Sequence, residues 1–211
     1  MNLQEIIAKS KVFDYIEQHI IKHHQIYRTI ITAELWEEIL SSSLHRVGMN
    51  NDWCNNHSHA SGKDMTITDG EYKGLQLSCK SGVVSSCRKG YNTVKFSGYR
   101  TQKYTKLEDK IDYICQPHYD IHFLLSKSKS KDKNIVNYNI YSIDRKQLNY
   151  QDFDWKEGKN CYYMESPIFN AVILTNLSSQ LWTTIREDSI IKHKNISVTL
   201  NNTFKTDNND Q

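Results

Sequence analysis

The chain has 211 residues, of which 38% are hydrophobic and 24% are charged, and its formal net charge is +3 at pH 7. This length suits a compact fold with a sizeable core, while only two prolines and eight glycines argue against a low-complexity or linker-rich protein. A net charge this small does not by itself predict a nucleic-acid partner. The five cysteines are odd in number and lack framework spacing, so we expect reduced thiols.

Two helices, over residues 2–24 and 27–45, are the first predicted elements. The second is apolar nearly all round, which indicates that it is buried. At about 100° per residue, Glu37 falls inside its apolar arc, and Glu34 and Glu38 are the other acids of this helix. A buried carboxylate costs several kcal/mol unless it is paired, and a bound cation is one remedy. An ion pair with a basic residue, or exposure at a partner interface, remains an alternative for Glu37.

A β-hairpin over residues 61–82 is the next predicted element, with Asp69-Gly70 supplying its turn. Apolar and polar residues alternate along both strands, so one face enters a core and the other is polar. The polar face carries Asp64, Thr66, Thr68, Gln76, Ser78 and Lys80. A carboxylate and an ammonium group on a rigid sheet suit metal-assisted attack on a phosphodiester. Asp64 would hold the cation, and Lys80 would orient the water.

Two features flank these strands. Glu71-Tyr72-Lys73 also places an acid two residues before a lysine, but it follows the turn and lacks flanking apolar residues. We therefore expect it at an exposed loop tip. The loop over residues 48–64 is dense in turn formers, and His59 within it is placed either to touch a phosphate beside Asp64 or to pack the turn.

A basic block follows the hairpin, because no Asp or Glu occurs between Lys73 and Leu107. Basic and aromatic residues interleave there, which is typical of phosphate binding, although a solvated charged face is the alternative. The DNA contacts that we predict, besides His59, are Arg88, Lys89, Lys95, Tyr99, Arg100, Thr101, Gln102 and Lys103. Because Arg100 is followed by groups suited to base edges, we expect it to read a base and Lys89 to contact phosphate.

A helix over 103–114 and strands over 119–126, 134–142, 161–165, 168–174 and 180–186 complete the predicted elements. This succession predicts an α/β fold in which a central mixed β-sheet is flanked by helices. No apolar run is long enough to span a bilayer, and the first residues lack a signal-peptide core. We expect a cytoplasmic protein without a membrane partner.

The hairpin resembles the core of the PD-(D/E)xK nuclease superfamily, which has an acid on one strand and acid-x-Lys on the next. Ser78 stands where the family usually has its second carboxylate, and some type II restriction endonucleases of this superfamily carry Ser-x-Lys there. Two further stretches, SGYRTQK at 97–103 and SSQLW at 178–182, resemble segments of type II restriction endonucleases. The resemblance covers roughly residues 30–185, in pieces.

This resemblance implies a restriction-endonuclease-like domain over residues 1–200. The polar composition of residues 201–211 predicts a disordered tail. It implies Mg²⁺-dependent hydrolysis of double-stranded DNA at a short palindromic site by a homodimer. Asp64 and an acid from the preceding helix, Glu37, would bind Mg²⁺, Lys80 would position the water, and Ser78 and Gln76 would tune the site. The alternatives are a nicking or repair nuclease of the same superfamily, and a non-catalytic DNA-binding protein with a decayed site.

Overall fold

A computed structural model describes residues 11–53, 63–129, 134–176 and 178–200. The helices among these residues are α2 (Val12–Ile26), α3 (Ala33–Arg46) and α4 (Leu107–Cys115), with short 3-10 helices η1 (Arg145–Gln147) and η2 (Glu187–Ser189). The strands are β1 (Met65–Thr66), β2 (Gln76–Ser86), β3 (Asn92–Arg100), β4 (Ile121–Lys129), β5 (Ile135–Asp144), β6 (Lys156–Gly158), β7 (Cys161–Glu165), β8 (Phe169–Leu174), β9 (Gln180–Arg186) and β10 (Ile191–Thr199).

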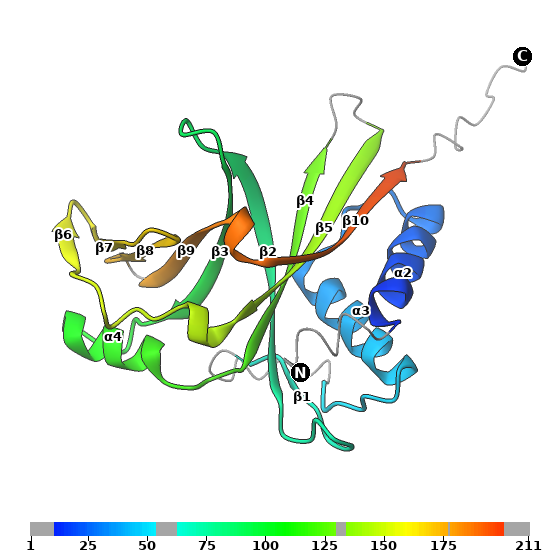
Figure 1. Cartoon of the computed structure of the whole chain (residues 1–211), viewed down its shortest axis with the longest axis horizontal. Coiled ribbons are helices and arrows are strands. Elements are labelled where there is room, and N and C mark those ends of the chain that lie inside the picture. The colour runs from blue at the N-terminus through cyan, green and yellow to red at the C-terminus, as the bar shows by residue number, and fades with distance from the viewer. Residues whose placement is uncertain (1–10, 54–62, 130–133, 177, 201–211) are drawn as a thin grey trace, which may run out of the picture.

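In the part of the chain that the structure describes, one mixed sheet of ten strands dominates an α/β fold (Figure 1). Its strand order is β10-β5-β4-β2-β3-β9-β8-β7-β6, and the short β1 pairs with β2 beside this path. β2 and β4 run parallel, and α4 lies in the crossover that leads from β3 to β4. This agrees with the predicted α/β class and its mixed sheet flanked by helices.

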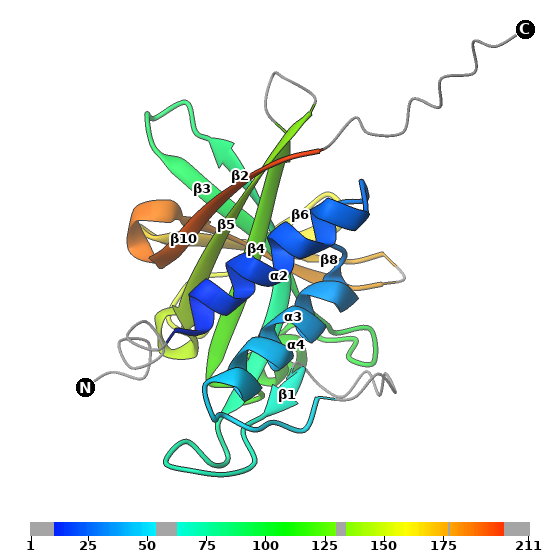
Figure 2. The same ribbon diagram turned by 90° about the vertical axis from the view of Figure 1, so that its right-hand side faces the viewer.

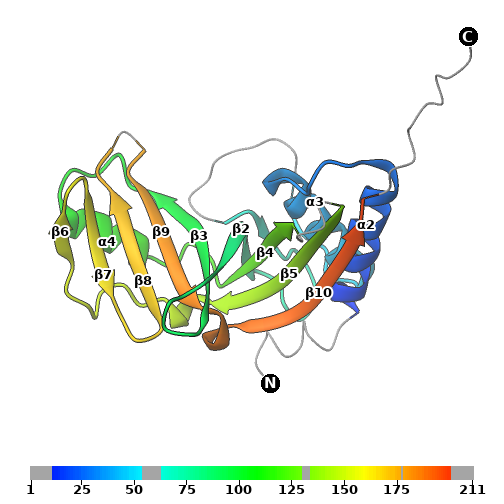
Figure 3. The same cartoon turned by 90° about the horizontal axis from the view of Figure 1, so that it is seen from above.

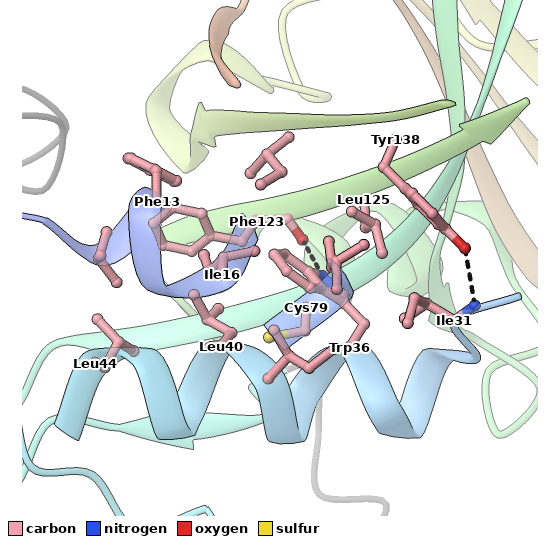
Figure 4. Packing of buried hydrophobic residues seen from close by; sticks show 14 of the residues in the cluster. Phe13, Ile16, Ile31, Trp36, Leu40, Leu44, Cys79, Phe123, Leu125 and Tyr138 are labelled. Atoms are coloured by element: carbon pink, nitrogen blue, oxygen red, sulfur yellow. Dashed lines mark hydrogen bonds between the residues drawn. The ribbon is translucent and has the colours of Figure 1, made fainter. Parts of the chain in front are cut away.

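Helices α2 and α3 lie side by side across one face of the sheet, over β4, β5 and β10 (Figure 2). Trp36 of α3 has no exposed surface, and its Nε1 donates to the carbonyl oxygen of Phe123 at 3.3 Å. At the start of α3, the backbone N–H of Ile31 donates to the Tyr138 hydroxyl at 3.2 Å (Figure 4). These bonds satisfy polar atoms inside an apolar core and fix α3 against β4 and β5.

A second core fills the opposite face of the sheet, where α4 lies beside the β6–β8 end (Figure 3). It contains Val94 and Phe96 of β3, Leu124 of β4 and Tyr141 of β5. The sheet is therefore buried on both faces near its centre. β2 and β4, which separate the two cores, are central strands.

The observed elements differ from the predicted ones chiefly at the start of the second helix and in three strands. The second helix begins at Ala33 rather than near residue 27, because the Thr32 side chain caps it by accepting from the backbone N–H of Leu35 at 3.3 Å. β3, β6 and β10 were not predicted as strands. β10 is an edge strand with only two buried residues, Ile196 and Val198. Its lysines and Asn195 interrupt the apolar pattern, so the sequence does not indicate a strand there.

None of the helices in the described ranges is long and apolar enough to cross a membrane. The predicted tail over 201–211 and the loop residue His59 lie outside the described residues.

Candidate active site

The predicted hairpin is present, and it ends in a gap between two strand pairs. Met65 of β1 pairs with Leu77 of β2, and the backbone N–H of Asp64 donates to the Leu77 carbonyl at 2.8 Å. β3 begins to pair with β2 only at Gly82. Between Leu77 and Gly82, the described residues place no paired strand along this edge of β2. The Asp64 carboxylate reaches into that gap.

The Asp64 carboxylate is held by three donors from β2, all of which reach Oδ2. They are the Ser78 hydroxyl at 3.2 Å, the backbone N–H of Cys79 at 2.6 Å and the Lys80 ammonium at 3.0 Å. The side chains of Asp64 and Lys80 are each 19% exposed, so the ion pair lies at the boundary between core and solvent. The acid and the lysine that the sequence singled out are therefore in direct contact.

Glu37 is the helix acid whose charge acts on a residue of this site, Cys79. Burial raises the pKa of the Cys79 thiol well above its usual value, and the carboxylates of Asp64 and Glu37 raise it further. The thiol itself points into the core below α3 (Figure 4). Both carboxylates therefore act electrostatically on the same thiol, which lies between Ser78 and Lys80 in β2.

The three candidate acids of α3 differ in exposure. Glu37 is half-buried, and its Oε2 accepts from Trp53 Nε1 at 3.4 Å, whereas Glu34 and Glu38 are exposed. This is the ranking that the apolar arc of the helix predicts.

The carboxylates of this site suit only a Mg²⁺ ion that takes few ligands from the protein. Among the described residues, no group of three or more His, Cys, Asp or Glu side chains is placed to hold a metal. Magnesium sites that act on phosphates commonly use one or two carboxylates, with water and substrate oxygens completing the shell. Asp64 and Glu37 are the two carboxylates that such a site would use, and the three donors from β2 all reach Oδ2 of Asp64 rather than Oδ1.

The other predicted site residues occupy different surroundings. Ser78 has no exposed surface, and its hydroxyl contacts Asp64. On the predicted polar face it lies beside His122 of β4, which is also buried. Gln76 is half-buried, and its backbone N–H donates to Asp120 rather than to the site. Glu71 and Lys73 are exposed in a turn, which confirms the prediction of a loop tip.

His122 is a site neighbour that the sequence analysis missed. It pairs with Ser78 across the β2–β4 ladder and is 2% exposed. Strand alternation in YDIHFLLS already separates His122 from Ile121 and Phe123. The sequence does not reveal that β4 pairs with β2, since parallel partners are joined by a long crossover.

The predicted DNA contacts divide between the two ends of β3. Arg88 and Lys89 are exposed at the tip of the β2–β3 turn, where Gly90 N–H donates to the Cys87 carbonyl at 3.0 Å. Arg100, Gln102 and Lys103 are exposed at the other end. β3 has 9 residues, so at about 3.3 Å per residue it separates these groups by roughly 30 Å. Lys95 lies between them, exposed, with its Nζ 5.0 Å from the centre of the Trp182 ring.

Tyr99 and Thr101 do not fit the predicted direct contact with DNA, because both side chains are buried. Tyr99 packs in the second core against Tyr113 and Tyr119. The hydroxyl of Thr101 is bonded to Ser179 at 3.0 Å, and the Lys110 ammonium donates to the Thr101 carbonyl at 3.1 Å. These two residues therefore fix the turn that carries Arg100 and Gln102.

The two stretches that resemble restriction-endonuclease segments lie side by side. Ser97 and Arg100 of β3 pair with Trp182 and Gln180 of β9, and the register shifts between them. The Gln180 amide closes this irregularity by donating to the Gly98 carbonyl at 2.7 Å.

The chain matches no protein-family model, no curated protein and no solved structure.

Proposed function

We propose that the chain is a metal-dependent endonuclease with a restriction-endonuclease-like core, which hydrolyses phosphodiester bonds of double-stranded DNA. The observation that carries this proposal is the contact at 3.0 Å between Asp64, which immediately precedes β1, and Lys80 of the neighbouring strand β2, beside the unpaired stretch of the β2 edge. A serine hydroxyl and a backbone N–H orient the same carboxylate, so its position is fixed before any substrate binds.

Each residue of the site has a role that follows from its chemistry. Mg²⁺ bound by Asp64 and Glu37 would polarise the phosphate and lower the pKa of a bound water. The Lys80 ammonium would orient the attacking water and offset the charge that develops on the phosphate oxygens. Ser78 would keep the Asp64 carboxylate turned toward the gap, through the bond that it donates now.

Cleavage of both strands requires two such centres, because each chain supplies one. We therefore expect a homodimer whose twofold axis matches a palindromic site, as in a type II restriction enzyme. A monomer that cuts one strand would instead be a nicking or repair nuclease of the same chemistry. The exposed basic residues at both ends of β3 would contact a stretch of DNA close to one helical turn long.

A non-catalytic DNA-binding protein is the second candidate. Its support is that the described residues already satisfy Asp64 with three protein donors, and that Ser78 replaces the second strand acid. In such a protein the Asp64–Lys80 ion pair has no catalytic role, and the basic residues alone bind the DNA.

Incubation of the protein with mixed-sequence plasmid, in Mg²⁺ or in EDTA, separates the two candidates. Discrete fragments that require Mg²⁺ are the expected result, and sequencing their ends gives the recognition site. Nicked circles without linear product would indicate a nicking enzyme. Retarded but intact plasmid would support the DNA-binding protein, and plasmid that is neither cut nor retarded would contradict both.

A further inference from the structure

His122 differs from the other deeply buried histidine, His24, in how its ring is satisfied. His24 is 3% exposed, and its two ring nitrogens lie 2.8 Å from the Tyr138 hydroxyl and 3.3 Å from the Tyr27 carbonyl. His122 is 2% exposed, and its Nδ1 is buried with no hydrogen-bond partner in the described part of the chain. The first ring has a complete set of partners, and the second does not.

The surroundings of His122 fix its ring without satisfying it. The Tyr119 ring lies 3.8 Å from the imidazole centre, and Phe96 meets it edge-on at 5.3 Å. A phenylalanine would fill this aromatic slot without leaving a polar atom unpaired. An unpaired buried polar atom costs about 1–3 kcal/mol, so the imidazole is explained best by a partner that arrives in another state of the site.

Lys80 is the donor best placed to become that partner. The β2–β4 register sets Ser78 beside His122 and Lys80 beside Leu124, so Lys80 and His122 are diagonal neighbours on one face. Strands lie about 4.8 Å apart and two residues span about 6.6 Å along a strand, so diagonal neighbours on one face are roughly 8 Å apart, within reach of a long side chain. The charge of Lys80 also acts on His122. Burial is the larger cause and the Lys80 charge the smaller one, and together they hold the pKa of His122 well below its usual value. The ring is thus neutral near pH 7 and has one nitrogen free to accept.

We propose that His122 is a positioning residue for Lys80, which donates to His122 Nδ1 when a divalent cation engages Asp64. In the structure, the Lys80 ammonium donates to the Asp64 Oδ2 atom at 3.0 Å. A cation on that carboxylate repels the ammonium and weakens the ion pair, so the ammonium needs a second acceptor. Nδ1 of the tautomer protonated on Nε2 supplies one, and no proton is transferred. The role in cleavage rests on the proposed function, but the exchange of partners does not.

The direct test is a Mg²⁺ titration, without DNA, of the full chain labelled with ¹⁵N in its histidines. The His122 Nδ1 resonance should shift as the Mg²⁺ site fills, while the resonances of His24 stay in place. In Lys80→Ala the shift should disappear. A His122 signal that is unchanged at saturating Mg²⁺, or a full shift that persists in Lys80→Ala, would overturn the proposal.

Matched substitutions separate this role from a structural one. His122→Phe should leave the melting temperature of the metal-free protein unchanged or raise it, because it removes an unpaired atom. His24→Phe should lower the melting temperature, because it breaks bonds that are present. Equal losses for the two variants would make His122 a structural residue and overturn the proposal.

Cleavage kinetics supply the third measurement. His122→Phe should lower kcat roughly 10- to 100-fold with KM for DNA unchanged, as for other residues that orient a catalytic group. His122→Asn keeps a polar atom near the Nδ1 position and should recover part of the loss, whereas His122→Gln should not. If the wild-type protein shows the Mg²⁺-dependent shift but never cuts DNA, the partner exchange stands and the nuclease proposal fails. If it cuts DNA without the shift, the nuclease proposal stands and the partner exchange fails.

Discussion

At the scale of single residues, the serine at position 78 determines the charge of the site when no metal is bound. A carboxylate at this fully buried position would lie beside Asp64, and two such charges repel each other unless a cation separates them. The hydroxyl instead donates to Asp64 at 3.2 Å. The hydroxyl therefore avoids this repulsion, and in the proposed nuclease the second carboxylate would come from another element.

Glu37 is the residue we expect to supply that carboxylate. Glu37→Gln should reduce the cleavage rate and raise the Mg²⁺ concentration required for half-maximal activity, because the site would lose one of its two anionic ligands. Glu34→Gln is the matched control, since Glu34 lies on the same helix but is exposed. Titration of the cleavage rate with Mg²⁺ measures both variants. The same Mg²⁺ requirement in Glu37→Gln and the wild type would exclude Glu37.

Among single residues, sequence reasoning succeeded where local geometry decides the outcome. Alternation along two short strands is enough to bring Asp64 and Lys80 together, and helical periodicity singles out Glu37 from its neighbours. It failed where long-range packing decides. The burial of Thr101 depends on Ser179 and on Lys110, which are distant in the sequence or on another element.

At the scale of elements, β2 links the two halves of the proposed site. Its first half carries Ser78 and Lys80 between β1 and β4, and its second half pairs with β3 and ends at the basic turn. The predicted basic block is therefore not a single patch. It is two exposed groups, one on the β2–β3 turn and one at the end of β3, with the exposed Lys95 between them.

These two groups should respond differently to substitution. Lys89→Ala should weaken binding about equally on cognate and random duplexes and reduce the salt slope by about one unit, because it removes a phosphate contact. Arg100→Ala should cost roughly 1–3 kcal/mol on the cognate duplex alone, because it removes a base contact. Binding measured at two salt concentrations tests both. If neither variant changes binding to either duplex, the basic residues form only a solvated face.

The elements that were missed share a physical cause. β3 does alternate, with Val94 and Phe96 buried, but a glycine and a register shift interrupt it before Arg100. In β10, charged residues dominate the first half, and pairing with β5 rather than intrinsic pattern makes it a strand. Pairing partners, unlike alternation, are not encoded in a short window of sequence.

At the scale of the whole molecule, buried histidines couple stability to pH. Burial lowers the pKa of His24 and His122, and it lowers that of His193 to about 4. In the unfolded chain these groups titrate near about 6.5. Below that pH the unfolded state binds more protons than the folded state, so stability is lost as pH falls.

Urea unfolding should therefore show full stability above about pH 6.5 and a steady decline from there toward about pH 4. Carboxylates such as Glu187, whose pKa is lowered chiefly by the Tyr141 hydroxyl, contribute to the decline only at the acid end of this range. His193→Phe should flatten the decline, because it removes one of the titrating groups. An unfolding free energy that is constant between pH 7 and pH 5 would contradict this account.

The Asp64–Lys80 pair is the proposed hydrolytic centre, and single-turnover plasmid cleavage in Mg²⁺ tests this role most directly. Lys80→Ala and Asp64→Ala should abolish cleavage while DNA binding stays close to wild type, since both side chains are partly exposed and the apolar residues of the hairpin stay packed in the core beneath α3. Glu71→Ala and Lys73→Ala, at the exposed turn of the same hairpin, should cut normally. A Lys80→Ala protein that cuts at nearly the wild-type rate would contradict the central claim.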